Sequence, residues 1–334
     1  MGILRLKGQK GLINRLFLDV PEFTTIITVI SLFIIATIIN PVFISPNNIA
    51  AISLLMMYFG FIALGETLVI VVGEVDISIG SMTAFSMMFQ AWLIVYHDFP
   101  WQMAAFLAIC LTVGLSFASS LLIVKMKMPA FIVTIAMLYI CRGGSRMLTF
   151  SKDIPAFKSP KAEGLMELGA SKVFGNFGWG IVTLIILMIV MHIIITRTAY
   201  GRKLYAVGDN LKAARLSGID SDLIKISAFL FSGVMVGVTS MFLLANTGTA
   251  SMSTGDGWEM FVVAGCAIGG ISLSGGAGSM MGTFLGVAFV TSMKNVLNMT
   301  AVNANWQNII FGSIIILAVL LDLVRRNRKF GIQD

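Results

Sequence analysis

Long apolar runs, separated by short polar or charged breaks, make up most of this chain. A helix that spans a membrane needs about 20 mostly apolar residues. Ten segments fit this pattern, at residues 23–43, 49–72, 80–96, 101–124, 129–150, 175–196, 223–245, 258–272, 279–298 and 305–324. The runs are continuous rather than alternating, which favours helices over the strands of a β-barrel. The pattern predicts an all-α, polytopic membrane helical bundle with about ten transmembrane segments. Segment 258–272 is short and rich in glycine, so we expect a broken or partial span there.

The composition narrows the class of protein further. Hydrophobic residues make up 57% of the 334 residues and charged residues only 12%, against about 45–50% and about 25% in a soluble domain. The net charge of +7 does not indicate nucleic-acid binding, because the basic residues lie between apolar runs rather than on a hydrated face. A soluble enzyme, a disordered chain and a nucleic-acid binder are therefore excluded. No stretch is long or polar enough for a second folded domain, so residues 1–334 are predicted to form a single transmembrane domain.

The basic residues also predict the orientation of the bundle, because cytoplasmic loops carry an excess of Lys and Arg. They gather in the N-terminal tail (1–22), in the loop 201–222 and after the last apolar segment (325–329). The loop 151–174, on the opposite side, carries four lysines and is the main exception. We predict that both termini are cytoplasmic.

Two carboxylates interrupt the apolar pattern within residues 73–80. A charge at bilayer depth costs about 2.5–3.5 kcal/mol on insertion scales, so such residues usually face the bundle interior or water. Glu74 and Asp76 lie between two glycines here, and Asp76 or Ser78 can cap the helix that follows. Glu66 lies earlier, inside an apolar run. Two interpretations stay open for this group: a short hydrated turn beside a buried hydrogen-bonding carboxyl, or part of a transport pathway or its gate.

The basic loop 201–222 contains the pattern of a short capped helix. Asp209 or Asn210 can cap a helix that starts near Leu211, and Gly218 suits the position just past its end. The helix carries both apolar and basic side chains. It is therefore either a solvated connector or a docking element for a cytoplasmic partner, and the mixed surface favours docking.

A third unusual segment, residues 255–286, is rich in glycine. Small residues let membrane helices approach each other closely, so tight helix packing explains the composition. A second interrupted helix that lines the pathway is the alternative. Glu259 lies near the start of the segment, next to Trp258, which suits an anchor at the membrane interface.

Several catalytic signatures are missing from the sequence. There is no Gly-Lys pair, hence no Walker A phosphate loop, and no H-E-x-x-H metal motif. Gly270–Leu273 imitates the nucleophile of an intramembrane serine protease, but nothing places His97 or His192 beside Ser272. We predict no catalytic residue and no metal site.

Three ordered blocks give the chain a family resemblance. Residues 67–70 and 75–81 are similar to the pattern TLVI…GIDLSVGS, residues 206–219 to AxGGNxxAARLSGI, and residues 257–278 carry a Gly-Trp-Glu-Met and a Gly-rich stretch. In these blocks the chain resembles the ribose-type permeases of bacterial ABC sugar importers. Arg142-Gly143 and the residues around Pro129 fit the same family.

The resemblance implies a permease subunit of the bacterial inner membrane that imports a sugar or a similar small polar solute. It implies a second permease copy or paralogue, ABC ATPase subunits that bind the ATP, and a periplasmic or lipid-anchored solute-binding protein. This chain itself would hold no cofactor. The loop 201–222 would contain the coupling helix that contacts the ATPase, with the residues Gly208, Asp209, Asn210, Ala213, Ala214, Arg215, Leu216 and Gly218.

The chain departs from the family pattern at Glu66, Glu74 and Asp209, where the family commonly has uncharged residues. The extra carboxylates put a usual pentose or hexose in doubt as the solute. For the pathway or gate we predict Glu66, Glu74, Asp76, Ser78, Ser81 and Glu259. An ion- or proton-coupled secondary transporter that titrates Glu66, Glu74 and Asp76 is the alternative function.

Overall fold

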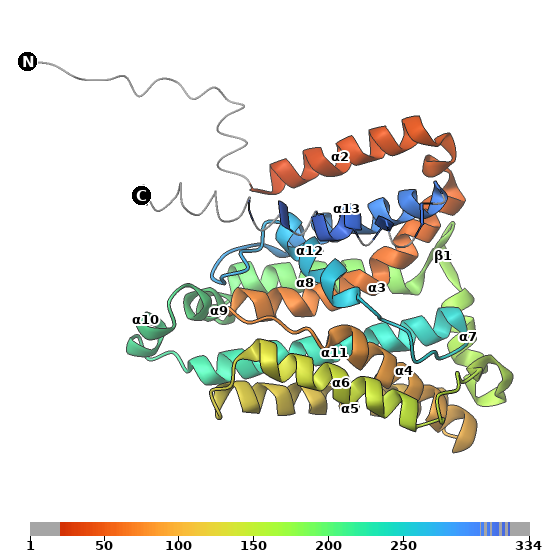
Figure 1. Cartoon of the computed structure of the whole chain (residues 1–334), viewed down its shortest axis with the longest axis horizontal. Coiled ribbons are helices and arrows are strands. Elements are labelled where there is room, and N and C mark those ends of the chain that lie inside the picture. Colours follow the sequence, from red (N-terminus) through yellow and green to blue (C-terminus); the bar gives the residue numbers. More distant parts are fainter. Residues whose placement is uncertain are drawn as a thin grey trace, which may run out of the picture.

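The computed structural model describes residues 21–300, 302–303, 306–307, 309–313, 316–317 and 320. Within this part, eight helices are long and apolar enough to cross a membrane (Figure 1). They are α2 (Pro21–Ile39), α3 (Pro46–Val71), α4 (Ile79–Tyr96), α5 (Trp101–Val124), α6 (Ala130–Met147), α8 (Trp179–Arg197), α11 (Ser221–Thr247) and α13 (Met280–Met299). The all-α membrane bundle predicted from the sequence is confirmed, and α5 has the predicted bounds. The predicted last span, 305–324, lies largely outside the described residues, as do most of the N-terminal tail and the C-terminal basic cluster.

The two ends of the bundle carry different small elements (Figure 1). At one end lie α9 (Ala199–Asp209) and α10 (Leu211–Leu216). At the other end, the segment between α6 and α8 forms short elements rather than a plain loop, and Ile154 pairs with Ala250 beside them. These elements are η2 (Ala156–Lys158), η3 (Pro160–Ala162), α7 (Glu163–Ala170) and the antiparallel hairpin of β1 (Lys172–Phe174) and β2 (Phe177–Gly178). A further turn, η1 (Pro41–Ile44), joins α2 to α3.

Proline and glycine set many helix ends, as their backbone preferences require. Pro46 occupies the first turn of α3, and the Ser45 hydroxyl accepts a hydrogen bond from the Asn48 amide. Asp220 caps α11 by accepting from the Leu223 amide, and α11 ends at Gly248 in the left-handed conformation.

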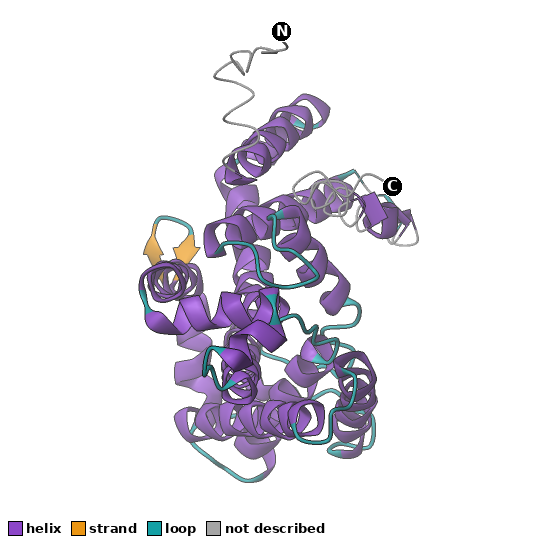
Figure 2. Ribbon diagram, turned by 90° about the vertical axis from the view of Figure 1, so that its left-hand side faces the viewer, coloured by secondary structure: helices purple, strands orange, loops and turns teal. Residues whose placement is uncertain are grey.

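The core lies around α3 and α11, and α2 lies at the periphery. The most apolar window of α3 is 83% buried and that of α11 is 72% buried, against 11% for α2. Small residues bring the central helices together, since Gly65 of α3 packs on Ser232, and Gly237 of α11 packs on Ile109. In a view close to the helix axes, the helices pack side by side, with the hairpin at the margin (Figure 2).

Two interruptions break the regular pattern of long helices. The first is residues 72–78, between α3 and α4, which are not helical. The second is the short helix α12 (Trp258–Ile268) together with the non-helical residues on both sides of it, 248–257 and 269–279. The 11 residues of α12 reach only about 16 Å at 1.5 Å per residue, against a hydrocarbon core of about 30 Å. Segment 258–272 is therefore a partial span, as its length and glycine content led us to expect, and not a complete one.

Candidate functional site

The two interruptions meet deep inside the bundle, at a contact that we call the deep junction. Gly80, in the first turn of α4, lies so close to Gly255 that a Cβ atom on either residue would overlap the backbone of the other. From Gly80 to Tyr96, α4 runs for about 24 Å at 1.5 Å per residue, and α4 contacts η2 and η3, the short elements next to α7. The contact therefore lies most of a membrane thickness away from the α7 end.

Four of the predicted pathway residues come together next to the deep junction. The Asp76 amide donates to Glu66 Oε1 (2.9 Å), and Asp76 Oδ1 accepts from the Ser78 amide (2.8 Å) and hydroxyl (2.5 Å). The Ser81 hydroxyl donates to the Ser78 carbonyl oxygen (2.7 Å). All four side chains are buried, and Glu66 Oε2 has no hydrogen-bond partner in the described structure.

These contacts correct the prediction that the side chain of Asp76 or Ser78 caps α4. Ser78 is the N-cap residue of α4 but makes no side-chain cap hydrogen bond. Asp76 binds Ser78 instead of the free amides of the following helix. Asp76 is 1% exposed, so it does not lie in a turn open to solvent.

A second charged group lies on the other side of the deep junction. Arg142 of α6 donates to the carbonyl oxygens of Met252 (2.9 Å) and Thr254 (2.7 Å), and it pairs with Asp256 (2.6 Å). Glu259 Oε2 lies 2.9 Å from the position that a Cβ on Gly80 would take. Arg142 thus ties α6 to the non-helical segment that enters α12.

Sequence reasoning named Glu259 but missed Arg142 and Asp256 as site residues. The available signal was Arg142 itself, a basic residue within the apolar run 129–150. The partner of Arg142 could not be found from spacing, because Asp256 lies more than a hundred residues later in the chain.

The interrupted segments meet a second time near α10, at a contact that we call the α10 junction. The Gly276 amide donates to the Val71 carbonyl oxygen (2.9 Å). A Cβ on Gly208, at the end of α9, would overlap that same carbonyl and crowd the Gly276 amide. Asp209 packs against Gly276, which has a positive φ of 74°. One end of α9 therefore touches both interruptions through backbone atoms.

Helix α10 follows directly and has the predicted caps. Asn210 Oδ1 accepts from the Ala213 amide (3.0 Å), and Gly218, just past the helix, has φ +78°. Ala214 faces inward and is buried, whereas Ala213 is exposed and Leu216 is 90% exposed. The helix therefore has one anchored side and one open side with an apolar residue.

Charged side chains connect α10 and the first interruption to the start of α11. Arg215 donates to the Ser221 hydroxyl (2.8 Å) and pairs with Asp222 (2.9 Å) at the start of α11. Glu74 pairs with Lys225, one turn further along α11. The structure thus places Glu74 with the α10 residues, beside a cavity of about 680 Å³, and apart from Asp76.

The comparisons with known proteins identify the family. Residues 48–319 match the family described as the permease component of the branched-chain amino acid transport system. The chain belongs to the permeases of ABC importers. This permease is similar to the ribose import permease protein RbsC of Bacillus subtilis (strain 168), with 32% identity over 87% of this chain and 89% of the relative. It is also similar to the autoinducer 2 import system permease protein LsrC of Escherichia coli (strain K12 / DH10B), with 31% identity over 90% of this chain and 86% of the relative. No solved structure matches it significantly.

Membership in this family confirms several expectations from the sequence. The permease is a multi-pass protein of the bacterial inner membrane, and it is a transport subunit rather than an enzyme, since the ATPase of such importers is a separate subunit. The secondary transporter coupled to ions or protons through Glu66, Glu74 and Asp76 is not supported.

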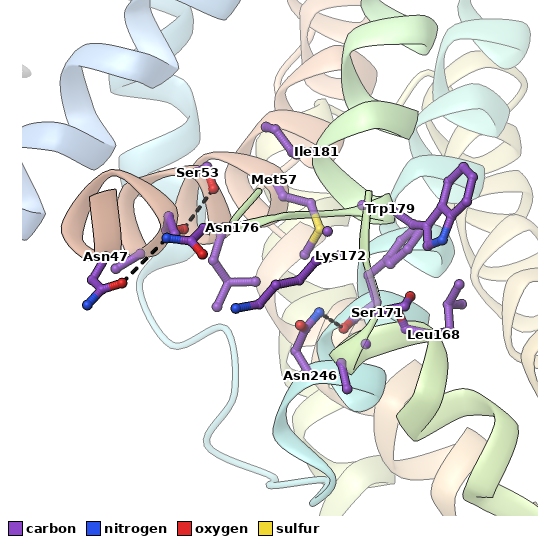
Figure 3. A pocket seen from close by; sticks show the side chains of 18 residues that line it. Asn47, Ser53, Met57, Leu168, Ser171, Lys172, Asn176, Trp179, Ile181 and Asn246 are labelled. Atoms are coloured by element: carbon purple, nitrogen blue, oxygen red, sulfur yellow. Dashed lines mark hydrogen bonds between the residues drawn. The ribbon is translucent and has the colours of Figure 1, made fainter. Parts of the chain in front are cut away.

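The permease also has a cavity of about 370 Å³ at the α7 end (Figure 3), and none of the predicted site residues lines it. Polar side chains from the hairpin, the start of α3 and the end of α11 line it, among them Asn47, Lys172, Asn176 and Asn246. Asn176 donates to Asn47 at 3.4 Å.

Proposed function

We propose that this permease imports a sugar or a similar small polar solute by alternating access, with a second copy or a paralogue beside it in the membrane. A periplasmic or lipid-anchored solute-binding protein delivers the solute, and ABC ATPase subunits bind and hydrolyse the ATP in the cytoplasm. The relatives named for ribose and autoinducer 2 support the solute class. The chain itself needs no cofactor for this role.

The observation that carries the coupling part of the proposal is the α10 junction. Helix α10 exposes Leu216 while its buried Ala214 anchors it to the bundle. An exposed apolar side chain on a short anchored helix suits a groove on a partner protein. The proposed coupling residues are Gly208, Asp209, Asn210, Ala213, Ala214, Arg215, Leu216 and Gly218.

A displacement of α10 reaches both interruptions through Gly208, which touches Val71 and Gly276. The same interruptions meet again at the deep junction, where Glu66, Asp76, Ser78, Ser81 and Glu259 form the proposed gate. Packed backbone contacts have discrete arrangements rather than a continuous range, so they can transmit a switch between two states. Glu74 belongs to the coupling region around α10 rather than to the gate, because it pairs with Lys225 of α11.

With α10 on the cytoplasmic side, α7 and the hairpin lie on the outer side. Helix α2 then starts in the cytoplasm, as the basic residues of the tail predict. The cavity of Figure 3 opens on the side where the solute-binding protein docks.

The coupling assignment is tested by Leu216→Asp in a transporter that is expressed with its own ATPase and binding protein. We expect ATPase recovery with the purified permease to fall roughly tenfold or more, because a central apolar contact is lost. Phe157→Asp makes the matched change at the other end, where the residue is 57% exposed, and leaves ATPase recovery unchanged. Normal recovery and normal uptake of radiolabelled D-ribose by the Leu216 variant would contradict the assignment.

A further inference from the structure

Asp256 has an environment that the proposed gate does not explain. Its side chain is 68% exposed, although its partner Arg142 is only 12% exposed. The neighbouring Gly257 is exposed as well, and Met260, on the first turn of α12, is 49% exposed. A carboxylate, a backbone segment and an apolar side chain thus lie exposed within five residues of the chain, a group that we call the open face.

The depth of this face restricts what it can contact. Gly255 packs on Gly80, about 24 Å from the end of α4 at Tyr96 by helix rise. An exposed carboxylate at such a depth is costly in hydrocarbon, by about 2.5–3.5 kcal/mol on insertion scales. The open side of Asp256 therefore faces water or another protein surface rather than lipid.

The anchoring of Asp256 leaves part of its carboxylate free. Arg142 forms an ion pair with Asp256 Oδ1, and it donates hydrogen bonds to the carbonyl oxygens of Met252 and Thr254. In the described part of the chain no residue donates to Asp256 Oδ2. The guanidinium thus fixes the carboxylate in place, and one strong acceptor points to the open side.

We propose that Asp256, held by Arg142, is a binding site for hydroxyl groups of a neutral polyhydroxylated solute inside the translocation pathway. A fixed carboxylate oxygen accepts hydrogen bonds from hydroxyl donors, and bonds to a charged acceptor are the stronger ones. The negative charges of Asp256 and Glu259 disfavour solutes that carry phosphate or carboxylate.

This inference rests on the proposed import function, but its first test needs no knowledge of the solute. Asp256→Cys is made in the complete transporter with Cys110→Ser, because Cys110 is the exposed native cysteine and Cys141 and Cys266 are buried. Vesicles of both orientations are treated with a membrane-impermeant maleimide, with and without ATP and vanadate. We expect labelling in at least one state, roughly tenfold faster than for Phe117→Cys, which is 44% exposed on α5.

Two outcomes of this test overturn the proposal. Labelling of Asp256→Cys as slow as that of Phe117→Cys in every state would show that water does not reach it. A disulfide between two copies of the Asp256→Cys chain, without labelling, would make this face a permease dimer interface instead.

The second test addresses the class of solute. Uptake is measured for a panel of neutral monosaccharides and their phosphate esters, with Asp256→Asn and, as control, Asp98→Asn in the exposed turn between α4 and α5. We expect uptake of neutral sugars only, and a KM raised roughly tenfold by Asp256→Asn with the ATPase still bound, since a hydrogen bond to a charged group weakens. An unchanged KM, or preferred uptake of the phosphate esters, contradicts the site. Uptake of no sugar combined with normal labelling would instead overturn the proposed solute class and leave the water-exposed position of Asp256 standing.

Discussion

The deep junction and the α10 junction join the same two interrupted segments but surround them with different chemistry. At both, glycines let backbone approach backbone, at Gly80 with Gly255 and at Gly208 with Val71 and Gly276. At the deep junction the charges are buried or anchored, and they bind backbone amides and carbonyls. At the α10 junction they form side-chain ion pairs, of which Arg215–Asp222 is partly exposed and Glu74–Lys225 is largely buried.

The difference indicates that the two junctions have different roles in this permease. Charges that bind backbone groups fix the course of a non-helical segment, which suits a gate. A partly exposed ion pair such as Arg215–Asp222 costs little to rearrange, which suits a region that follows a moving partner. The comparison predicts that changes at the deep junction damage the fold, whereas changes at the α10 junction damage coupling in a folded protein.

The largest effect is expected for Arg142→Met. It leaves the carbonyl oxygens of Met252 and Thr254 and the carboxylate of Asp256 without their cation, so the free energy of unfolding falls by on the order of 3 kcal/mol. Thermal unfolding of the purified permease in detergent measures this loss. Arg146→Met, one turn further along α6 on an exposed position, serves as the control and stays within about 0.5 kcal/mol. Equal stability of the two variants would mean that the deep junction is not fixed by Arg142.

The next effect is expected for Gly208→Ala. The added Cβ overlaps the Val71 carbonyl oxygen, so α9 must shift away from both interruptions. We expect the ATPase to remain bound and active while uptake of D-ribose per ATP hydrolysed falls roughly tenfold. Gly143→Ala, where a Cβ meets nothing within 4 Å, leaves this ratio unchanged. Loss of the bound ATPase, rather than loss of coupling, would show that Gly208 serves only the docking of α10.

A smaller effect is expected for reversal of the Glu74–Lys225 pair. Glu74→Lys and Lys225→Glu each place like charges together, and the double variant restores an opposite pair. We expect each single change to lower uptake per ATP about fivefold and the double variant to recover most of it, in line with coupling energies of about 1 kcal/mol between contacting residues. A double variant as impaired as the sum of both single changes would remove this pair from the coupling path.

The smallest effect is expected for Lys125→Ala. Its pair with Asp222 is long, at 3.5 Å, and the Lys125 side chain is 63% exposed. Such a surface pair contributes about 0–1 kcal/mol and weakens with salt. Uptake and thermal stability measured at low and high salt should match those of the unchanged permease, and a marked loss at low salt would mean that this ion pair belongs to the coupling region.

The sequence was sufficient where local patterns decide structure. The bounds of α5 and the caps of α10 at Asn210 and Gly218 follow from apolar length and from side chains that act within one turn. The partial span at α12 followed from its length. The pathway residues Glu66, Asp76, Ser78 and Ser81 also came together as expected, because they flank one interruption.

The remaining features depend on contacts between distant segments. Glu74 and Asp76 are two residues apart in sequence, yet one pairs with Lys225 and the other with Glu66 and Ser78. The chain leaves α3 at Gly73, with φ +85°, and then turns back into the bundle, so the two side chains reach different depths. A polar break shows where a helix stops but not which segment its backbone meets, so neither the Gly80–Gly255 contact nor the role of Arg142 could be predicted.

The central claim is that α10 moves the deep junction through Gly208. The most direct measurement is the maleimide labelling rate of Asp256→Cys in the reconstituted transporter, with ADP and with ATP plus vanadate, in chains that carry Gly208 or Gly208→Ala. We predict that the nucleotide changes the labelling rate when Gly208 is present and that this change is lost in the Gly208→Ala chain, although the ATPase stays bound. An equal nucleotide effect in both chains would contradict the claim.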